Sequence, residues 1–420
     1  MTILLIYVAI FVIAFLVVRG ATRLVAARHD YTSLKTVTFG DESAVRPNRV
    51  ASILSVLTIF VIWGAFTGSN WVPVHAPGPF VGETQFTYTA ERADGARDDA
   101  TVHVVVNPPE GEQADAPEPA AGDGWAHDDG LAVTAWRSSL IRVDRNDDAE
   151  ERPQVVAIDG EPISPGGSVK VAHGKVTLSG KGTPNFIPDS GWQMEPIWLP
   201  APEAVVGRLI EIAQDGYQNS TLWEHLFWSL FRVILGFLCG ALVGIPLGYA
   251  MGLSNWFRGW FDPIVEFMRP VPPLALIPLV IIWAGIGEVG KIILLFLAAL
   301  WIMTISARSG VSGVAVSKVH AAFSLGASKW QVLRHVIIPN SLPEIFTGAR
   351  VAMGVCWGTV VAAELVAAEK GAGMMIMVAS KFQLTDIVIM GIILIGVIGY
   401  LIDILMRQGE KWLVPWKGRV

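Results

Sequence analysis

The chain has 420 residues, of which 52% are hydrophobic and only 16% are charged, whereas an average soluble domain carries about 25% charged residues. Its net charge of −6 hides an uneven distribution, because residues 67–195 contain 21 acidic and 9 basic side chains while the rest of the chain is basic. This composition excludes a soluble single-domain enzyme, and the high hydrophobicity excludes intrinsic disorder. It predicts a polytopic membrane protein with one water-soluble insertion.

Seven apolar segments are long enough to cross a membrane, which takes about 20 residues in a helix that rises ~1.5 Å per residue. They are residues 2–18, 50–66, 222–252, 262–285, 290–306, 345–367 and 385–405. We therefore expect an all-α core of about seven transmembrane helices in contact with lipid. The acidic segment is inserted between the second helix and the third.

Positive charge predicts how these spans are oriented, because Lys and Arg gather on cytoplasmic loops. No basic residue precedes the first span, and a basic cluster that begins at Arg19 follows it. We expect the N-terminus and residues 67–195 outside the cell, and residues 19–49, 307–344 and the C-terminus in the cytoplasm. The loop 19–49 is basic enough to suggest nucleic-acid binding, but membrane topology explains its charge and we expect no nucleic-acid partner.

The insertion is predicted to be β structure. Residues 86–106 alternate apolar and polar side chains around a turn-rich centre, which is typical of a β-hairpin, and residues 155–180 form a second such stretch with Asp-Gly and Pro-Gly-Gly turns. We expect a small β-sandwich-like domain. Its four histidines are scattered, so we expect no metal site, although Asp128 and Asp129 beside His127 make one conceivable.

Glycines mark a packing face on the third predicted span. They recur every four residues, at Gly236, Gly240, Gly244 and Gly248. Small residues at this spacing share one helix face and allow another helix to approach closely. Packing explains them without a ligand.

Residues 285–292 read GIGEVGKI and partly match the glycine spacing of phosphate-binding loops. Such loops need a strand before them and a helix after them in an α/β domain, whereas a membrane span precedes this one. We interpret the segment as a tight turn between two spans. Any ATP dependence must then come from another polypeptide.

Four ionisable residues lie within predicted spans, where charge is costly unless it is paired or faces water; they are Arg232, Glu266, Arg269 and Glu364. One hypothesis is that Arg232 and Arg269 line a cavity that passes an anion, because prolines after Arg269 break its helix and broken helices often line transport routes. The alternative is that the arginines form internal ion pairs, for example with Glu266 or Glu364, that fix helix packing.

The segment 319–343, in a loop predicted to be cytoplasmic, is expected to form a helix broken at Gly326 and then an amphipathic helix that ends at Pro339. The second helix has apolar residues spaced by three or four positions, which predicts one apolar face: Trp330, Leu333, Val336 and Ile337. A basic helix pair between two spans suits docking of a soluble partner.

The same segment resembles the EAA signature of permease subunits of ABC importers, with His320 where Glu is usual. The resemblance implies a coupling helix that engages the ATP-hydrolysing subunit, through His320, Ala321, Ala322, Gly326, Ala327, Ser328, Val336, Ile338 and Pro339. Residues 199–209, 261–288 and 346–364 resemble the nitrate/sulfonate/taurine branch of that family. In all, the resemblance covers residues 199–407 and the helix 50–66.

The resemblance further implies a type I importer permease core that works as a homodimer in a bacterial inner membrane. A partner ATPase dimer would bind Mg-ATP, and a periplasmic binding protein would deliver a small anionic solute such as a sulfonate or nitrate. No cofactor and no catalytic residue is expected in this chain.

The resemblance also suggests how the chain is divided. Residues 1–49 would be an extra helix with its basic loop, 50–66 the first core helix, 67–195 the periplasmic insert and 196–420 the rest of the core. The competing hypothesis is a non-transporting sensor or scaffold that presents an extracellular β domain.

Overall fold

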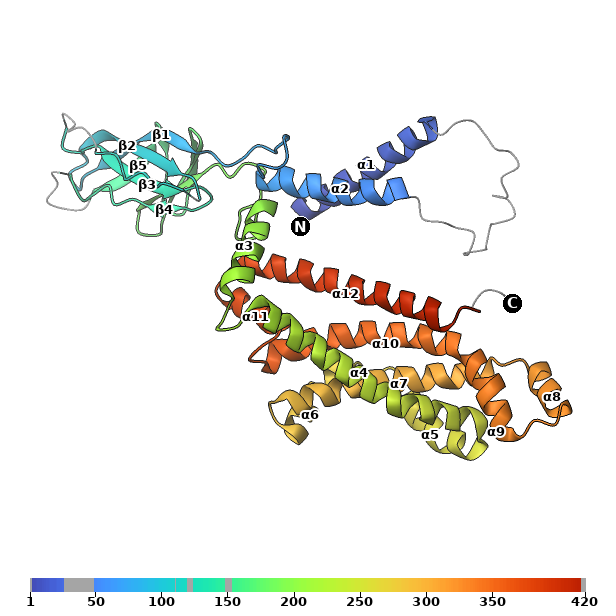
Figure 1. The fold of residues 1–420 in the computed structure, drawn as a ribbon. Coiled ribbons are helices and arrows are strands. Elements are labelled where there is room, and N and C mark those ends of the chain that lie inside the picture. Colours follow the sequence, from blue (N-terminus) through green and yellow to red (C-terminus); the bar gives the residue numbers. More distant parts are fainter. Residues whose placement is uncertain (1, 26–48, 110, 119–123, 148–152, 417–420) are drawn as a thin grey trace. The chain divides into compact units, whose positions relative to one another are not determined.

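The computed structural model describes residues 2–25, 49–109, 111–118, 124–147 and 153–416. The chain divides into two compact units, Met1–Glu203 and Ala204–Val420, whose elements are labelled in Figure 1. Most of the basic loop predicted at 19–49 and the last residues of the basic tail lie outside the described ranges.

The first unit begins with two apolar helices, α1 (Thr2–Val25) and α2 (Arg49–Thr67), where the sequence predicts the first two spans. Tyr7 and Phe66 join them edge to face, with ring centroids 4.6 Å apart. Helix α2 is long and apolar enough to cross a membrane, whereas the apolar part of α1, Leu5–Ala21, is shorter than the 18 residues such a helix needs here.

The rest of the first unit is a β domain of two sheets. Its strands are β1 (Gly82–Glu91), β2 (Arg97–Asn107), β3 (Asp129–Thr134), β4 (Ser139–Leu140), β5 (Gln154–Ile158), β6 (Glu161–Pro162), β7 (Ser168–Val171), β8 (Gly174–Leu178) and β9 (Pro184–Pro188). The strand orders are β3-β2-β1-β5-β6 and β4-β9-β8-β7. Strands β2 and β3 are parallel, and the other pairs are antiparallel.

Alternating side chains build the core between these sheets. Phe86, Tyr88 and Ala90 point inward from β1 and are buried, and Phe86 stacks on Phe186 of the other sheet at 5.9 Å between ring centroids. Strands β1 and β2 pair in register from Gly82 opposite Val106 to Glu91 opposite Arg97. The predicted hairpin and an inserted β region are therefore confirmed.

The second unit is helical. It contains α3 (Pro202–Asp215), α4 (Leu222–Leu253), α5 (Asn255–Met268), the 3-10 helix η3 (Pro273–Leu276), α6 (Ile277–Ala284), α7 (Glu288–Ser312), α8 (Val316–Ser324), α9 (Lys329–Val332), the π-helical turn η4 (Leu333–Ile337), α10 (Ile338–Ala367), α11 (Ala372–Lys381) and α12 (Thr385–Leu413). Figure 1 places α5, α8 and α9 at one end of this unit and α6 and α11 at the other.

The number of spans differs from the seven predicted. Among the described residues, five helices are long and apolar enough to cross a membrane, and α5 with α6 makes a sixth candidate only if the bent pair counts as one span. The span predicted at 262–285 is broken, as the prolines after Arg269 predict, because the chain turns by 93° between α5 and α6. Prolines cause the break: Pro272 and Pro273 have no N–H to continue the helix and start a new turn instead.

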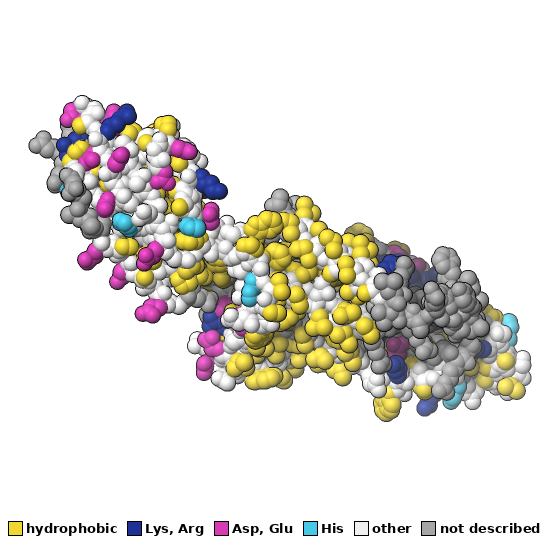
Figure 2. All heavy atoms as spheres, turned by 90° about the horizontal axis from the view of Figure 1, so that it is seen from above, with side chains coloured by type: hydrophobic (Ala, Val, Ile, Leu, Met, Phe, Trp, Pro, Cys, Tyr) yellow, Lys and Arg dark blue, Asp and Glu magenta, His cyan; other side chains and the backbone are white. Residues whose placement is uncertain are grey.

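Hydrophobic side chains cover much of the helical part of the surface seen in Figure 2, and acidic side chains are scattered over the β domain. Exposed apolar residues are frequent on α2 and α12, among them Ile53, Val56, Ile393 and Leu405. A surface of this kind suits contact with lipid tails. The uneven charge of the sequence thus corresponds to two physically different surfaces.

The glycine face of α4 packs against α7, as the sequence predicts. A Cβ added to Gly240 would lie 2.5 Å from the Cβ of Ala299, and one added to Gly244 would lie 2.7 Å from the carbonyl oxygen of Leu300. Both distances are shorter than real Cβ contacts allow. The two backbones can approach this closely only because the glycines have no side chain.

Pro339 does not end a helix, contrary to prediction. It lies in the first turn of α10, which follows directly from α9 and η4, so the chain is helical from Lys329 to Ala367. Within this continuous helix the missing N–H of Pro339 removes one backbone hydrogen bond. The wider π-helical turn at Leu333–Ile337 directly precedes α10 and accommodates the change in the backbone hydrogen-bonding pattern.

Candidate functional site

The predicted coupling segment is a helix, a tight turn and a second helix. Helix α8 ends beside Gly326, which has φ of +80° in the left-handed region that favours glycine. After the turn, the Ser328 hydroxyl accepts a hydrogen bond from the backbone N–H of Gln331 at 3.3 Å, and the Gln331 side chain accepts one from the N–H of Ser328 at 2.8 Å. This capping box starts α9, and the predicted break at Gly326 is confirmed.

One side of the segment packs against the end of α7. Val332 and Ile337 are buried with Val311 of α7. Ala322, Ala327 and Val336, all in the predicted coupling set, lie at the edge of this cluster and are partly buried. These three residues therefore help to pack the segment against α7.

The other side of the segment is open and apolar. Leu325 is 89% exposed, Trp330 65% and Phe323 46%. The predicted contact residues on this side are also exposed, namely His320, Ala321, Gly326 and Ser328. We call these seven residues the exposed docking face.

Trp330 was predicted to share one apolar face with Leu333, Val336 and Ile337, but it is exposed while those three are buried or partly buried. Helix α9 has only four residues before the π-helical turn, so the spacing of three and four does not hold across it. Val332 takes the buried position instead. Sequence reasoning did not identify Phe323 and Leu325. What sets them apart from other apolar residues is their exposure beside the turn at Gly326, which only the structure shows.

The last two coupling residues, Ile338 and Pro339, join the segment to α10. The Pro339 carbonyl accepts a hydrogen bond from Trp416 Nε1 at 3.3 Å. Lys318 of α8 donates to the side-chain oxygen of Asn340 at 2.8 Å. These contacts attach the segment to the start of α10.

A second candidate site is a buried ion cluster made of Arg232, Glu288, Lys291 and Glu364. Arg232 of α4 donates from Nη1 to Glu364 Oε1 of α10 at 2.6 Å, and from Nε and Nη2 to the two oxygens of Glu288 at 2.5 and 2.8 Å. Lys291, one turn further along α7, donates to Glu288 Oε1 at 2.9 Å. The cluster thus connects α4, α7 and α10.

Glu364 is the most enclosed member, with a side chain that is 0% exposed. It accepts further hydrogen bonds from the Ser229 hydroxyl at 2.8 Å and from the Gly373 N–H at 3.0 Å. These three donors offset the cost of burying a carboxylate inside a helix bundle. The Glu364 carboxylate also fixes the start of α11 against α4.

The other two predicted pathway residues lie apart from this cluster. Glu266 accepts a hydrogen bond from Arg308 at 2.9 Å, near the opposite end of α7. Arg269 is 65% exposed and its Nη1 lies 3.7 Å from Glu266 Oε2. The structure therefore brings Arg232 together with Glu364 and Arg269 together with Glu266, but it does not bring the two arginines together.

Glu288 and Lys291 are the members of the cluster that sequence reasoning missed. Both belong to the GIGEVGKI segment, where Gly285 has φ of +74° and Gly287 precedes the first residue of α7. The segment is a tight turn, as predicted. The available signal was a Glu and a Lys three residues apart at the start of an apolar helix, which places both on one face.

The described part of the β domain contains no cluster of potential metal ligands. Among the described residues, no group of three or more His, Cys, Asp or Glu side chains is arranged to hold a metal ion. The Asp129 carboxylate accepts a hydrogen bond from the buried Tyr88 hydroxyl at 3.1 Å. Burial raises the pKa of Asp129 to about 7.

Comparison with known proteins shows which family the helical unit matches. Residues 207–414 match the family model described as the binding-protein-dependent transport system inner membrane component. The taurine transport system permease protein TauC of Escherichia coli is 48% identical over 54% of this chain and 83% of its own length. The putative aliphatic sulfonates transport permease protein SsuC of the same species is 39% identical over 54% of this chain and 84% of its own length.

A more distant relative extends the set. The nitrate import permease protein NrtB of a Synechocystis strain is 31% identical over 52% of this chain and 81% of its own length. The resemblance drawn from the loop residues is thereby confirmed over most of the length of several relatives. The chain belongs to the family of binding-protein-dependent transport system inner-membrane components, the permease subunits of ABC importers.

Proposed function

We propose that this chain forms the translocation pathway of an importer for a small organic anion of the sulfonate type. The observation that carries the proposal is the 48% identity to a taurine permease over 83% of that protein's length. The relative named for aliphatic sulfonates supports the same class of solute, and the relative named for nitrate supports only an oxyanion. A small solute with a compact oxyanion is common to the three.

The proposed arrangement in the membrane follows the charge of the loops. The N-terminus and residues 67–195 face the periplasm, and residues 19–49, 307–344 and the C-terminus face the cytoplasm, where basic residues gather. Two copies of the chain work as a homodimer with an ATPase dimer that binds Mg-ATP. A periplasmic binding protein delivers the solute.

The exposed docking face is the proposed contact with the ATPase. It presents three large apolar side chains to solvent, and an apolar patch on a rigid support is typical of a protein interface. His320 adds no acidic charge, so the contact rests on Leu325, Trp330 and Phe323. The partly buried Ala322 and Ala327 pack the same segment against the end of α7.

Copurification of the ATPase tests this contact. Leu325→Asp should abolish recovery of an ATPase that carries a complete phosphate-binding loop, because it places a charge in an apolar interface. Leu325 is 89% exposed, so the change removes no packing within the chain. Leu140→Asp, at a 60% exposed leucine of the β domain, is the matched control and should recover the ATPase normally.

Two results would contradict the proposal. Normal ATPase recovery with Leu325→Asp would place the contact elsewhere. Failure of the unaltered chain to recover any ATPase would favour the sensor or scaffold hypothesis, in which the β domain rather than transport is the function.

A further inference from the structure

Three consecutive backbone N–H groups at the start of α11, from Gly371 to Gly373, are bound by side chains of other helices. The first donates to Nδ1 of His225 at 3.1 Å, the second to the hydroxyl of Ser229 at 3.0 Å, and the third to Oε2 of Glu364 at 3.0 Å. The first N–H groups of a helix have no partner within it. These contacts therefore satisfy the start of α11 and hold the turn between α10 and α11 (residues 368–371) on α4.

The side chains that α4 contributes lie on one buried face. His225 and Ser229 are 0% exposed and Arg232 is 1% exposed, and their spacing of four and three residues places them on the same side of the helix. Arg232 also donates from Nη1 to the carbonyl oxygen that precedes Gly371, at 2.8 Å. The turn is packed closely, since a Cβ added at Gly371 would lie 2.4 Å from Cδ of Glu364.

The contacts of His225 specify one protonation state of its ring. Nδ1 faces the N–H of Gly371, which can only donate, so Nδ1 is the acceptor. Nε2 lies 3.0 Å from the carbonyl oxygen of Tyr217, which can only accept, so Nε2 carries the proton. A doubly protonated ring has two donors. A second proton would therefore replace the hydrogen bond from Gly371 by two opposed N–H groups.

The charged groups beside His225 on α4 and the turn are not partners of its ring. Glu224, the residue before it, accepts a hydrogen bond from Lys370 of the turn at 3.3 Å, and Glu369 of the turn is exposed. Tyr217, in the loop before α4, contacts the ring through its carbonyl oxygen. Both ring nitrogens thus contact backbone groups, so a second proton acts first on the contact with the turn.

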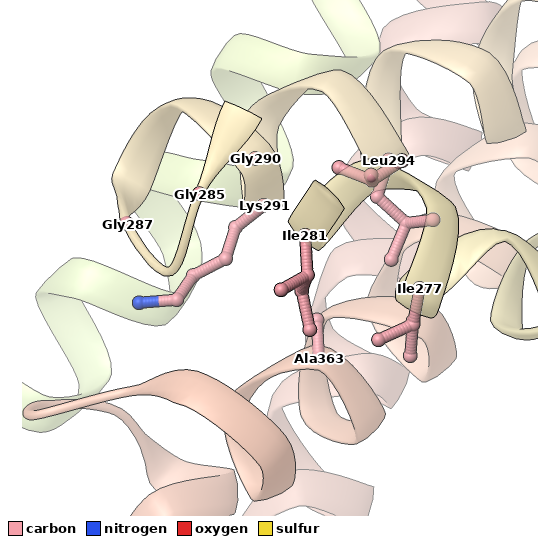
Figure 3. Close-up of a pocket in the computed structure, with 9 residues that line it drawn as sticks. Ile277, Ile281, Gly285, Gly287, Gly290, Lys291, Leu294 and Ala363 are labelled. Carbon is pink, nitrogen blue, oxygen red and sulfur yellow. The ribbon is translucent and has the colours of Figure 1, made fainter. Parts of the chain in front are cut away.

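From α7 and α10 the charged groups are those of the buried ion cluster, and they pair with one another. Glu364 accepts from Arg232 at 2.6 Å, and Lys291 donates to Glu288 at 2.9 Å. Figure 3 shows the amino group of Lys291 directed away from Ala363, the residue next to Glu364. The cluster therefore holds Glu364 in place for α11 without supplying a charge to the ring of His225.

The capped turn also lies at the far end of the helix that begins at the coupling segment. The chain is helical from Lys329 to Ala367, and Figure 1 places α8 and α9 at one end of the helical unit and α11 at the other. A helix that joins the exposed docking face to the turn needs a fixed far end if its movement is to rearrange the bundle.

We propose that His225 is a positioning residue for transport: its neutral ring holds the α10–α11 turn on α4, and import falls when the ring takes up a second proton. The inference rests on the proposed function, because transport is the process that requires the turn to be held. In the proposed orientation α4 begins on the periplasmic side, so the ring responds to acid outside the cell. Histidine is the side chain that commonly changes its charge between about pH 5 and 8.

NMR of the purified full chain in lipid nanodiscs, with isotope-labelled histidine, tests the protonation state independently of transport. At about pH 7.5 the signals that His225→Gln removes should be those of a neutral ring protonated on Nε2. If His225→Gln does not fold, His225→Asn gives the same assignment. Signals of a doubly protonated ring, or of a ring protonated on Nδ1, would overturn the proposal.

Uptake of radiolabelled taurine by cells tests the role in transport. Uptake through the unaltered chain should fall about twofold or more between about pH 7.5 and pH 5.5, where histidine becomes charged. His225→Gln keeps one donor and one acceptor but takes up no proton, so it should retain most of the uptake at the higher pH and lose the fall. His225→Leu keeps neither group and should lose most of the uptake at both pH values.

A matched control and the proposed function separate the possible outcomes. His173→Asn, at an exposed histidine of the β domain with φ of +57° that asparagine also adopts, should keep the pH profile of the unaltered chain. Uptake through the unaltered chain that does not fall with acid, or a full fall in His225→Gln, would refute the role of His225 and leave the proposed function standing. If the unaltered chain imports no taurine at any pH, the proposed function fails and the role of His225 in transport fails with it.

Discussion

Removal of one charge from the buried ion cluster should destabilise the helical unit strongly. Glu364→Gln is the sharpest change, because the amide keeps the shape of the side chain and can still accept hydrogen bonds from Ser229 and Gly373. What it removes is the charge opposite Arg232, where the two side chains are 0% and 2% exposed. Breaking a buried pair in this way costs about 3–5 kcal/mol.

The size of the expected shift follows from the size of the unit, Ala204–Val420. For a unit of this length, 1 kcal/mol lowers Tm by about 2–4 °C, so Glu364→Gln should lower it by roughly 6–20 °C. Thermal unfolding of the full chain in nanodiscs, followed by tryptophan fluorescence, measures this. Glu344→Gln, at an exposed position, is the control and should shift Tm by less than about 2 °C.

A double variant decides whether the charge pair is the cause. If Arg232 and Glu364 stabilise each other, Arg232→Met combined with Glu364→Met should cost clearly less than the sum of the two single changes. Strictly additive losses, or a Glu364→Gln chain as stable as the unaltered one, would refute the reasoning.

Two further predictions concern packing and pH. Gly240→Leu should greatly reduce the yield of folded chain on size-exclusion chromatography, since even a Cβ there would lie 2.5 Å from that of Ala299. The control Gly259→Leu should not reduce the yield, because no atom lies within 4 Å of a Cβ added at Gly259. Equal yields of the two variants would contradict the close approach of the helices. The pKa of Asp129 is raised to about 7 in the folded chain, whereas it is ~4 in the unfolded chain. Between these pH values the folded β domain therefore binds one proton more than the unfolded one. Its free energy of unfolding should fall as pH rises from about 4 to 7. Asp129→Asn should reduce that slope in thermal unfolding at several pH values, with the remainder due to Asp147, whose pKa burial also raises. An unchanged slope would assign it to other groups.

Local patterns in the sequence were sufficient to predict much of the fold. The hairpin over 86–106 follows from alternation, and the close-packing face of α4 follows from glycines spaced by four. The turn at Gly326 follows from a glycine between two helical stretches. Each of these features depends on residues close together in the chain, so one stretch of sequence contains the whole signal.

Features that depend on distant partners could not be predicted in the same way. Glu288 contacts Arg232 across 56 positions in the chain, and nothing near either residue identifies the other as its partner. The outward position of Trp330 depends on a π-helical turn, which breaks the period of 3.6 that the prediction assumed. The 93° bend after Met268 shows a related limit, because prolines predict that a helix breaks but not in which direction the chain continues.

The central claim is that this chain transports a sulfonate-type anion into the cell and that ATP hydrolysis by a partner subunit drives the transport. Uptake of radiolabelled taurine and ethanesulfonate by cells, with and without the chain and with ATP supply intact or depleted, tests it most directly. We predict accumulation that requires both the chain and ATP and that Leu325→Asp abolishes. Uptake that is unchanged when the chain is deleted would contradict the account.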